Sequence, residues 1–432
     1  MNTAAAALAA KPARTVSRYR WSICALLFLA TTINYMDRQI LGLLAPMLQK
    51  DIGWTQMEYS WIVNAFQFSY AVGLLGFGWV IDKLGTKLSY SIAMLFWSGA
   101  AMLHAAVGSV AGFAGARALL GLGEAGNFPS AIKATAEWFP KEERALATGL
   151  FNSGANIGAV FAPALIPWIA LNYGWRGAFI IIGALGLVWL LPWAKFFGKP
   201  EAMAAVDAEE LAHIRQDNTA EENSVVPPTV KWTSLLGHRQ TWAFAIGKFC
   251  TDPIWWFFLF WLPKWLNETR QIDLAHMGAP LVAVYLFATV GSVGGGWISG
   301  ALMKTGMTSS RARKMAMFLC ACCVVPIAFA TVVQSLWVAV ILVGLAAAAH
   351  QGWSANIFTT ASDMFPKHAV GSVVGIGGMA GSLGGVLFST VIGVVLERTG
   401  NYWALFTISA CAYLVAFVIF HLLAPGMKKV EL

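Results

Sequence analysis

The chain has 432 residues, of which 58% are hydrophobic and only 12% are charged, about half the charged share of an ordinary soluble protein. A water-soluble domain cannot hide so much apolar surface, which excludes a cytosolic enzyme, a nucleic-acid-binding protein and a disordered chain. The net charge of +8 does not point to a nucleic-acid partner, because membrane proteins concentrate Lys and Arg in cytoplasmic loops. We predict an all-α polytopic membrane protein, since the apolar runs are long and continuous rather than alternating.

Apolar runs long enough to cross a bilayer recur along the whole chain. They predict twelve transmembrane helices, at 21–48, 58–82, 87–107, 111–137, 144–171, 175–197, 240–266, 277–303, 312–333, 336–364, 368–396 and 402–424. One long polar stretch separates the first six from the last six, and part of it, 207–215, is suited to a surface helix. We therefore predict a six-helix bundle over 1–197, a cytoplasmic linker over 198–239 and a second six-helix bundle over 240–432.

The distribution of basic residues predicts the orientation of these helices. With the N-terminus in the cytoplasm, 20 Lys and Arg residues fall on the cytoplasmic side and 5 on the outer side. This is the positive-inside bias of membrane proteins. We expect both termini in the cytoplasm, and a multi-pass monomer in the inner (plasma) membrane.

The two halves of the sequence resemble each other. The segment EWFPK at 137–141 returns as DMFPK at 363–367, each at the expected end of a fourth helix of its half. Repeats of six helices in the same direction place a pseudo-twofold axis along the membrane normal, with a site between the halves. Chance similarity between glycine-rich helices is the alternative.

Charged residues near mid-span are the strongest functional signal. In the first half they are Asp37, Arg38, Arg117 and Glu124. A charge at bilayer depth costs about 2.5–3.5 kcal/mol on insertion scales, so it persists only when it is paired or faces an aqueous path. Ion pairs that only join helices are one explanation, and a binding site is the other.

Helical spacing favours convergence of these groups. Arg117 and Glu124 are seven residues apart, about two turns, and so share a helix face. Asn34 lies three residues before Asp37, and Tyr35 three before Arg38, so each charge has a polar companion on its own stripe. A guanidinium can bind a carboxylate through two hydrogen bonds, while protonation removes the cost of burying a carboxylate.

The loop after the second predicted helix, GWVIDKLGTK at 78–87, resembles the cytoplasmic signature of the major facilitator superfamily, with Thr86 where that family usually has Arg. The resemblance implies that Asp82, Lys83 and Gly85 act in gating, because Asp82 can latch the halves near helix N-termini and cationic partners.

A narrower resemblance rests on INYMDR at 33–38, RALLGLGEAGNFP at 117–129 and FNSG at 151–154. These segments resemble the anion:cation symporter family, and most of all its bacterial permeases for hexuronates and related sugar acids. The resemblance implies the major facilitator fold and a proton symporter that imports a sugar acid such as galacturonate or glucuronate. Aldonates, aldarates and other carboxylates are the alternative cargoes, and Ala155, where relatives carry Gln, leaves the sugar open.

The same resemblance implies roles for single residues. Asp37 and Glu124 would carry protons, and Arg117 would partner Asp37 and sense its charge. Arg38 would hold the substrate carboxylate, while Tyr35 and Tyr70 would hydrogen-bond the sugar.

The second half offers weaker candidates for substrate contacts. Lys248 and Asp252 are four residues apart, so they either neutralise each other or present Lys248 as a second cation. His350 falls 226 residues after Glu124, the offset of the repeat. The further candidates are Gln351, Asn356, Asn152 and Asn156.

Other classes of function have little support in the sequence. The stretch at 121–126 spells GxGxxG, but it lies inside a span without a βαβ unit, so close helix packing explains it better than a dinucleotide site. The six cysteines lie in apolar runs without metal-ligand spacing. We expect no metal or organic cofactor, with protons as the coupling ion. An intramembrane enzyme or a sensor would need a nucleophile cluster or an added soluble domain.

Overall fold

The computed structural model describes residues 18–216 and 232–431. Within these ranges the first half is built from α1 (Tyr19–Ile52), α2 (Gln56–Leu84), α3 (Thr86–Leu103), α4 (Val110–Glu124), α5 (Asn127–Trp138) and α6 (Lys141–Phe196), with a 3-10 turn at His104–Ala106. The linker region carries a 3-10 turn at Pro200–Ala202, α7 (Ala208–Arg215) and α8 (Trp232–Leu236).

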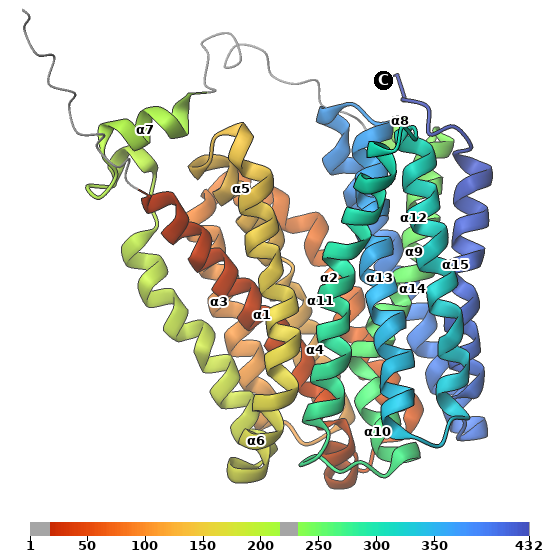
Figure 1. Cartoon of the computed structure of the whole chain (residues 1–432). Helices are drawn as coiled ribbons and strands as arrows, with labels where there is room; N and C mark the ends of the chain where they lie inside the picture. Colours follow the sequence, from red (N-terminus) through yellow and green to blue (C-terminus); the bar gives the residue numbers. More distant parts are fainter. Residues whose placement is uncertain (1–17, 217–231, 432) are drawn as a thin grey trace, which may run out of the picture.

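The second half has α9 (Arg239–Phe260), α10 (Leu262–Arg270), α11 (Gly278–Lys304), α12 (Ser309–Val324), α13 (Leu336–Met364), α14 (Lys367–Thr399) and α15 (Trp403–Leu423). A 3-10 segment at Val325–Thr331 prolongs α12. The two halves stand side by side, with α7 and α8 at one end of the molecule and α10 at the other (Figure 1).

All twelve predicted spans lie in helical segments, which confirms the predicted fold class, although the spans at 111–137 and 240–266 are each divided between two helices. Six helical stretches among the described residues are long and apolar enough to cross a membrane by themselves, namely Ala147–Phe196, Gly278–Lys304, Ser309–Thr331, Leu336–Met364, Ala369–Thr399 and Trp403–Leu423. The helix α6 contains two predicted spans, because the chain kinks at Gly174, whose φ of +74° suits glycine.

The fourth predicted span is not one continuous helix. It is broken between Glu124, the last residue of α4, and Asn127, the first of α5. Pro129 lacks the N–H that would bond to the carbonyl of Ala125, which weakens the helix at this point. Glu124 is thus held at a helix end.

The loop between α2 and α3 is a tight turn at Gly85, with a φ of +76° that side chains rarely adopt. Lys83 is exposed in the last turn of α2. The side chain of Asp82 lies outside the described part of the structure, so the gating roles stay a prediction.

The sequence repeat returns as a structural repeat. Pro140 precedes α6 and Pro366 precedes α14, both in extended backbone. The halves contact each other through α2 with α14 and through α11 with α6. In the first half, α2 and the first part of α6 are the second and fifth spans; in the second half these are α11 and α14. A pseudo-twofold axis therefore relates the contact of α2 with α14 to the contact of α11 with α6.

The halves are joined at the α10 end. Glu397 near the end of α14 accepts hydrogen bonds from the backbone N–H groups of Gln56 and Met57, at 3.0 and 3.4 Å, and so caps α2 from the other half. Tyr59 donates to the carbonyl of Phe260 at 2.7 Å. Five hydrogen bonds between the two halves involve residues 56–64 of α2.

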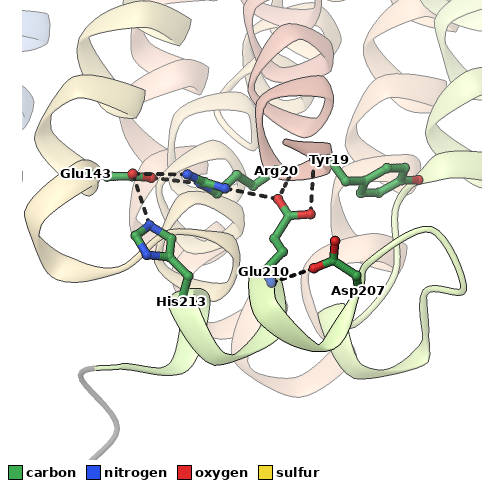
Figure 2. A network of polar contacts seen from close by, with 6 residues as sticks. All are labelled: Tyr19, Arg20, Glu143, Asp207, Glu210 and His213. Carbon is green, nitrogen blue, oxygen red and sulfur yellow. Dashed lines mark hydrogen bonds and ion pairs between the residues drawn. The ribbon is translucent and has the colours of Figure 1, made fainter. Parts of the chain in front are cut away.

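At the opposite end, α7 is docked on the N-terminal half, as the predicted surface helix over 207–215 (Figure 2). Glu210 of α7 is fully buried and accepts hydrogen bonds from the backbone N–H groups of Tyr19 and Arg20 at 3.2 and 3.0 Å. The guanidinium of Arg20 bridges Glu210 to Glu143 at the start of α6. His213 contacts the same Glu143 carboxylate at 3.1 Å.

This network ties the first part of the linker to the N-terminal bundle. It joins the N-terminus of α1 to the N-terminus of α6 through a helix more than sixty residues further along the chain. The division of the chain into domains at 197 and 239 stays a prediction.

Candidate functional site

The predicted charged residues of the first half come together in one buried cluster. The guanidinium of Arg38 on α1 contacts Glu124 on α4, with Nε and Nη2 at 2.9 and 2.8 Å from the same oxygen, Oε2. Glu124 is fully buried. Its other oxygen, Oε1, has no hydrogen-bond donor among the described residues. Arg38 and Glu124 therefore form an ion pair in which Oε1 of Glu124 can still accept a hydrogen bond.

Aromatic rings enclose the guanidinium of Arg38. Its central carbon lies 4.8 Å from the ring centres of both Tyr35 and Tyr70, and 5.2 Å from that of Phe66. The ring of Trp256, which belongs to α9 in the other half, lies at 5.4 Å. Such contacts between a cation and aromatic faces are attractive. They place Arg38 at the interface between the halves, beside the two tyrosines that the sequence predicted.

Arg117 lies deeper in the same cluster and is fully buried. Its Nη2 donates to the backbone carbonyl of Arg38 at 3.3 Å, and its guanidinium lies 4.6 Å from the ring centre of Phe66. Its Nε and Nη1 have no acceptor in the part of the chain that the structure describes. A buried guanidinium with open donors is costly, so the position is suited to a change of charge nearby.

Asp37 is buried without any hydrogen-bond donor to either oxygen, as far as the described residues show. Arg117 and Glu124 lie close enough to interact with it electrostatically, and the indole of Trp97 lies nearby without a hydrogen bond of normal geometry. Arg117 thus lies near Asp37, as expected, but does not form a hydrogen bond with it. The role of Arg117 as a charge sensor stays a prediction.

Asn34 contacts a different charge from the one that spacing indicated. Its Oδ1 accepts from Arg38 Nη2 at 3.3 Å, one turn along α1, rather than lying beside Asp37. The i to i+4 neighbour is favoured because the long Arg38 side chain extends back along the helix. Tyr35, in contrast, contacts Arg38 as predicted.

In the second half, Lys248 and Asp252 form an ion pair on α9, with 2.8 Å between Nζ and Oδ2. The ammonium also lies 4.2 Å from the ring centre of Phe358 on α13. Lys248, Asp252 and Trp256 follow one another at intervals of four residues, so they form one stripe along α9.

The other candidates of the second half have partners inside that half. His350 contacts the hydroxyl of Tyr413 at 2.5 Å through Nδ1 and stacks on Trp255 at 5.2 Å. Asn356 donates at 2.9 Å to the carbonyls of Gly295 and Gly352, which joins α13 to α11. These contacts explain both residues by packing, and their substrate roles stay predictions.

Three amide candidates retain free hydrogen-bonding groups. Asn152 is exposed and Asn156 partly exposed on α6, and Gln351 is partly exposed on α13. None of the three side chains has a hydrogen-bond partner among the described residues. They stay available as predicted contacts to a polar ligand.

The glycine-rich stretch of α4 packs against other helices. A Cβ at Gly123 would lie 2.8 Å from Phe96 and Trp97 of α3, and one at Gly121 would overlap Ser69 of α2. This confirms the packing explanation of the GxGxxG pattern. The described ranges hold no group of three or more His, Cys, Asp or Glu side chains that could bind a metal ion.

A profile described as "Major Facilitator Superfamily" matches residues 27–389, most of the chain. The chain belongs to the major facilitator superfamily. It is 31% identical over 419 residues to the hexuronate transporter of Escherichia coli K12, with 97% of each chain covered. It is 30% identical over 439 residues to a probable galactarate/D-glucarate transporter of Bacillus subtilis, covering 98% of this chain and 95% of that one.

The solved structures agree on the fold. The crystal structure of a D-xylose-proton symporter matches with a TM-score of 0.74 and 14% identity, over 96% of this chain and all of that one. The superfamily is one of transporters, so this member is a multi-pass membrane transporter and not an enzyme.

Sequence reasoning missed the aromatic part of this transporter's charged cluster. Phe66 contacts both Arg38 and Arg117, and Trp256 reaches Arg38 from the other half. Trp256 carried a usable signal, because it continues the stripe of Lys248 and Asp252. Phe66 carried none, since one aromatic residue in an apolar helix looks like any other.

Proposed function

We propose that this transporter imports a sugar acid together with protons, and that its cargo is a hexuronate such as galacturonate or glucuronate. The observation that carries the proposal is the buried cluster of Asp37, Arg38, Arg117 and Glu124 at the interface between the halves. The relatives named for hexuronate and for galactarate or glucarate support a sugar acid as cargo.

Arg38 is the residue best suited to hold the carboxylate of the substrate. Guanidinium and carboxylate match as two parallel hydrogen bonds, and such charge-assisted bonds are among the strongest in proteins. Arg38 already contacts a carboxylate, that of Glu124. The surrounding rings of Tyr35 and Tyr70 offer hydroxyl groups and flat apolar faces to a sugar.

Glu124 and Asp37 are the proposed proton carriers. When Glu124 takes up a proton it loses the charge that holds Arg38, and the guanidinium becomes available to the substrate. Asp37 is buried without donors, so its ionised form is costly and protonation relieves that cost. Proton uptake would thus precede or accompany the binding of the acid.

The predicted orientation in the membrane determines the direction of transport. The distribution of basic residues favours both termini in the cytoplasm of the cell that carries the protein in its inner membrane. The α10 end, where the halves are joined, then faces outwards. The cargo would enter when the contacts of α2 with α14 open, and would leave at the α7 end.

The first experiment uses counterflow in proteoliposomes with galacturonate, glucuronate, galactonate, glucarate and neutral sugars. We expect exchange of hexuronates and none of neutral sugars, because a neutral sugar gives Arg38 no carboxylate. Exchange of neutral sugars at the same rate would contradict the proposal.

The second experiment tests whether protons or sodium ions drive accumulation. We expect a proton gradient to drive accumulation and a sodium gradient at equal pH to have no effect, since two buried carboxylates replace the unwound backbone of typical sodium sites. Accumulation driven by sodium alone would refute proton coupling.

A further inference from the structure

Asp252 is a carboxylate with 19% of its side chain exposed, and it has no role in the function proposed above. Its Oδ2 lies 2.8 Å from Lys248 Nζ, one turn away on α9. The same oxygen lies directly against α14, where a Cβ added at Gly381 would overlap it. The glycine therefore leaves the space in which Asp252 can reach Lys248.

This pair faces the binding region rather than the lipid. Trp256, on the same stripe of α9, contacts Arg38 across the interface, with 5.4 Å between the guanidinium carbon and the ring centre. Asp252 is also within electrostatic range of Tyr35 on α1. Asp252 and Lys248 lie four and eight residues before Trp256, which corresponds to about 6 and 12 Å along the helix axis. The pair therefore lies about one sugar-acid length from Arg38, towards the α8 end of α9.

The two buried cations differ in what holds them. Arg38 is paired with Glu124, a proposed proton carrier, so one proton frees the guanidinium. Lys248 is paired with Asp252 and covered by Phe358, both in its own half. In the proposed function no proton is taken up by Asp252, the partner of Lys248. The ammonium of Lys248 therefore stays paired with Asp252.

We propose that Asp252 restricts the cargo to sugar acids with one carboxylate, an inference that rests on the proposed function. When one acid group binds Arg38, the far end of the substrate comes near Lys248 and Asp252. A hydroxyl or carbonyl can hydrogen-bond there without added charge. A second carboxylate meets the like charge of Asp252 and finds the ammonium already taken.

Overall similarity does not decide between these cargoes. The relative named for hexuronate, an acid with one carboxylate, and the relative named for galactarate or glucarate, acids with two, are 31% and 30% identical to this chain. In this proposal, the charges of Lys248 and Asp252 decide between acids with one carboxylate and acids with two.

The test compares galacturonate with galactarate, which share a six-carbon skeleton and differ in the second carboxylate. Binding to the purified full chain is measured by calorimetric titration. We expect the wild type to prefer galacturonate by at least about tenfold, the lower end of what a charge-assisted hydrogen bond contributes. Asp252→Asn should shift the ratio towards galactarate by at least about tenfold.

Two further variants show the mechanism. Adding Lys248→Met to Asp252→Asn should abolish the gain for galactarate, because the gained affinity depends on the released ammonium. Asp363→Asn is the matched control. That carboxylate also pairs with a cation of the second half, Arg313 at 3.3 Å, and it lies at the cytoplasmic end of α13. This control should leave the ratio unchanged.

The outcomes separate the inference from the proposed function. Equal affinity of the wild type for both acids overturns the inference, and this measurement needs no variant to fold. An equal change for both acids in Asp252→Asn overturns it as well. Galacturonate counterflow would leave the proposed function intact in either case. A wild type that binds neither acid overturns both.

Discussion

The charged cluster around Arg38 and the ion pair of Lys248 and Asp252 lie on opposite sides of one interface, but their hydrogen bonding differs. Around Arg38, Asp37 and Arg117 keep buried polar atoms without partners among the described residues. On α9, Lys248 and Asp252 face each other at 2.8 Å. Buried polar atoms without partners are costly, so the function proposed above assigns a change of charge or partner to the cluster around Arg38. The ion pair of Lys248 and Asp252 is already satisfied and keeps one arrangement of charge.

The largest effect should follow from removing the cation of the open cluster. Arg38→Ala takes away the proposed carboxylate ligand, and losing a charged hydrogen-bond partner costs about 1.5–3 kcal/mol or more. We expect galacturonate affinity to fall beyond detection in a calorimetric titration, with the circular dichroism of the wild type retained. Wild-type affinity in the folded variant would remove Arg38 from the site.

Coupling should be lost while binding is retained when the open cluster can no longer change charge. Glu124→Gln keeps the shape of the protonated carboxyl but cannot release a proton. We expect counterflow to persist and gradient-driven accumulation to stop, measured in the same proteoliposomes. Asp37→Asn should behave similarly or more severely. Normal accumulation by Glu124→Gln would leave Asp37 as the remaining carrier.

Stability should respond in opposite ways in the two regions. Lys248→Met leaves Asp252 without its partner, and breaking a buried pair costs up to about 3–5 kcal/mol. Asp37→Asn should cost little or even stabilise, because Asp37 loses no hydrogen bond in the described structure. Thermal unfolding of the purified variants measures both effects. A larger loss for Asp37→Asn would contradict the contrast.

The smallest effect concerns a third network, which lies at the α7 end of the molecule and in which Glu143 and His213 are partly exposed. Hydrogen bonding from Arg20 holds the pKa of Glu143 below its ordinary value, and His213 acts in the same direction. A lowered folded-state pKa means that docking of α7 is favoured above the ordinary pKa of Glu, about 4.3, and is lost as pH falls through the lower value.

We therefore expect hydrogen exchange in α7 to rise as the pH falls from about 5 to about 3, beyond the intrinsic change in exchange rate, because the lowered pKa of Glu143 lies below the ordinary value. The rise should be less than about tenfold, because partly exposed pairs contribute little. Glu143→Gln serves as the control, since it should exchange faster at pH 6 and show no further acid effect. Identical pH profiles for the two proteins would show that the Glu143 contacts do not hold α7.

The fold was largely predictable because bilayer-length apolar runs are a strong signal that tertiary contacts rarely override. The linker helix was predictable from its own residues as well, since Asp207 caps its first turn through the backbone N–H of Glu210. The break after Glu124 was less visible, because Gly126 and Pro129 occur in many continuous membrane helices.

The candidate site was predictable in its members but not in its pairing. Burial cost singles out Asp37, Arg38, Arg117 and Glu124 in any apolar helix. Which cation meets which carboxylate depends on how α1 and α4 rotate against each other. The family resemblance implied that Arg117 partners Asp37, but in the structure Arg117 donates to the backbone carbonyl of Arg38, and Arg38 pairs with Glu124.

The sequence by itself determined that this protein has twelve membrane-spanning helices with buried charges, because length, hydropathy and residue type are local properties that decide whether a segment is stable in a bilayer. Its motifs, through their resemblance to the major facilitator superfamily, also indicated a transporter. The tertiary structure alone decided that Trp256 closes over Arg38 from the other half, that Glu397 caps α2, and that Glu210 caps α1. Each of these contacts joins residues far apart in the chain, and only the packing of the helices fixes the distance and angle on which it depends.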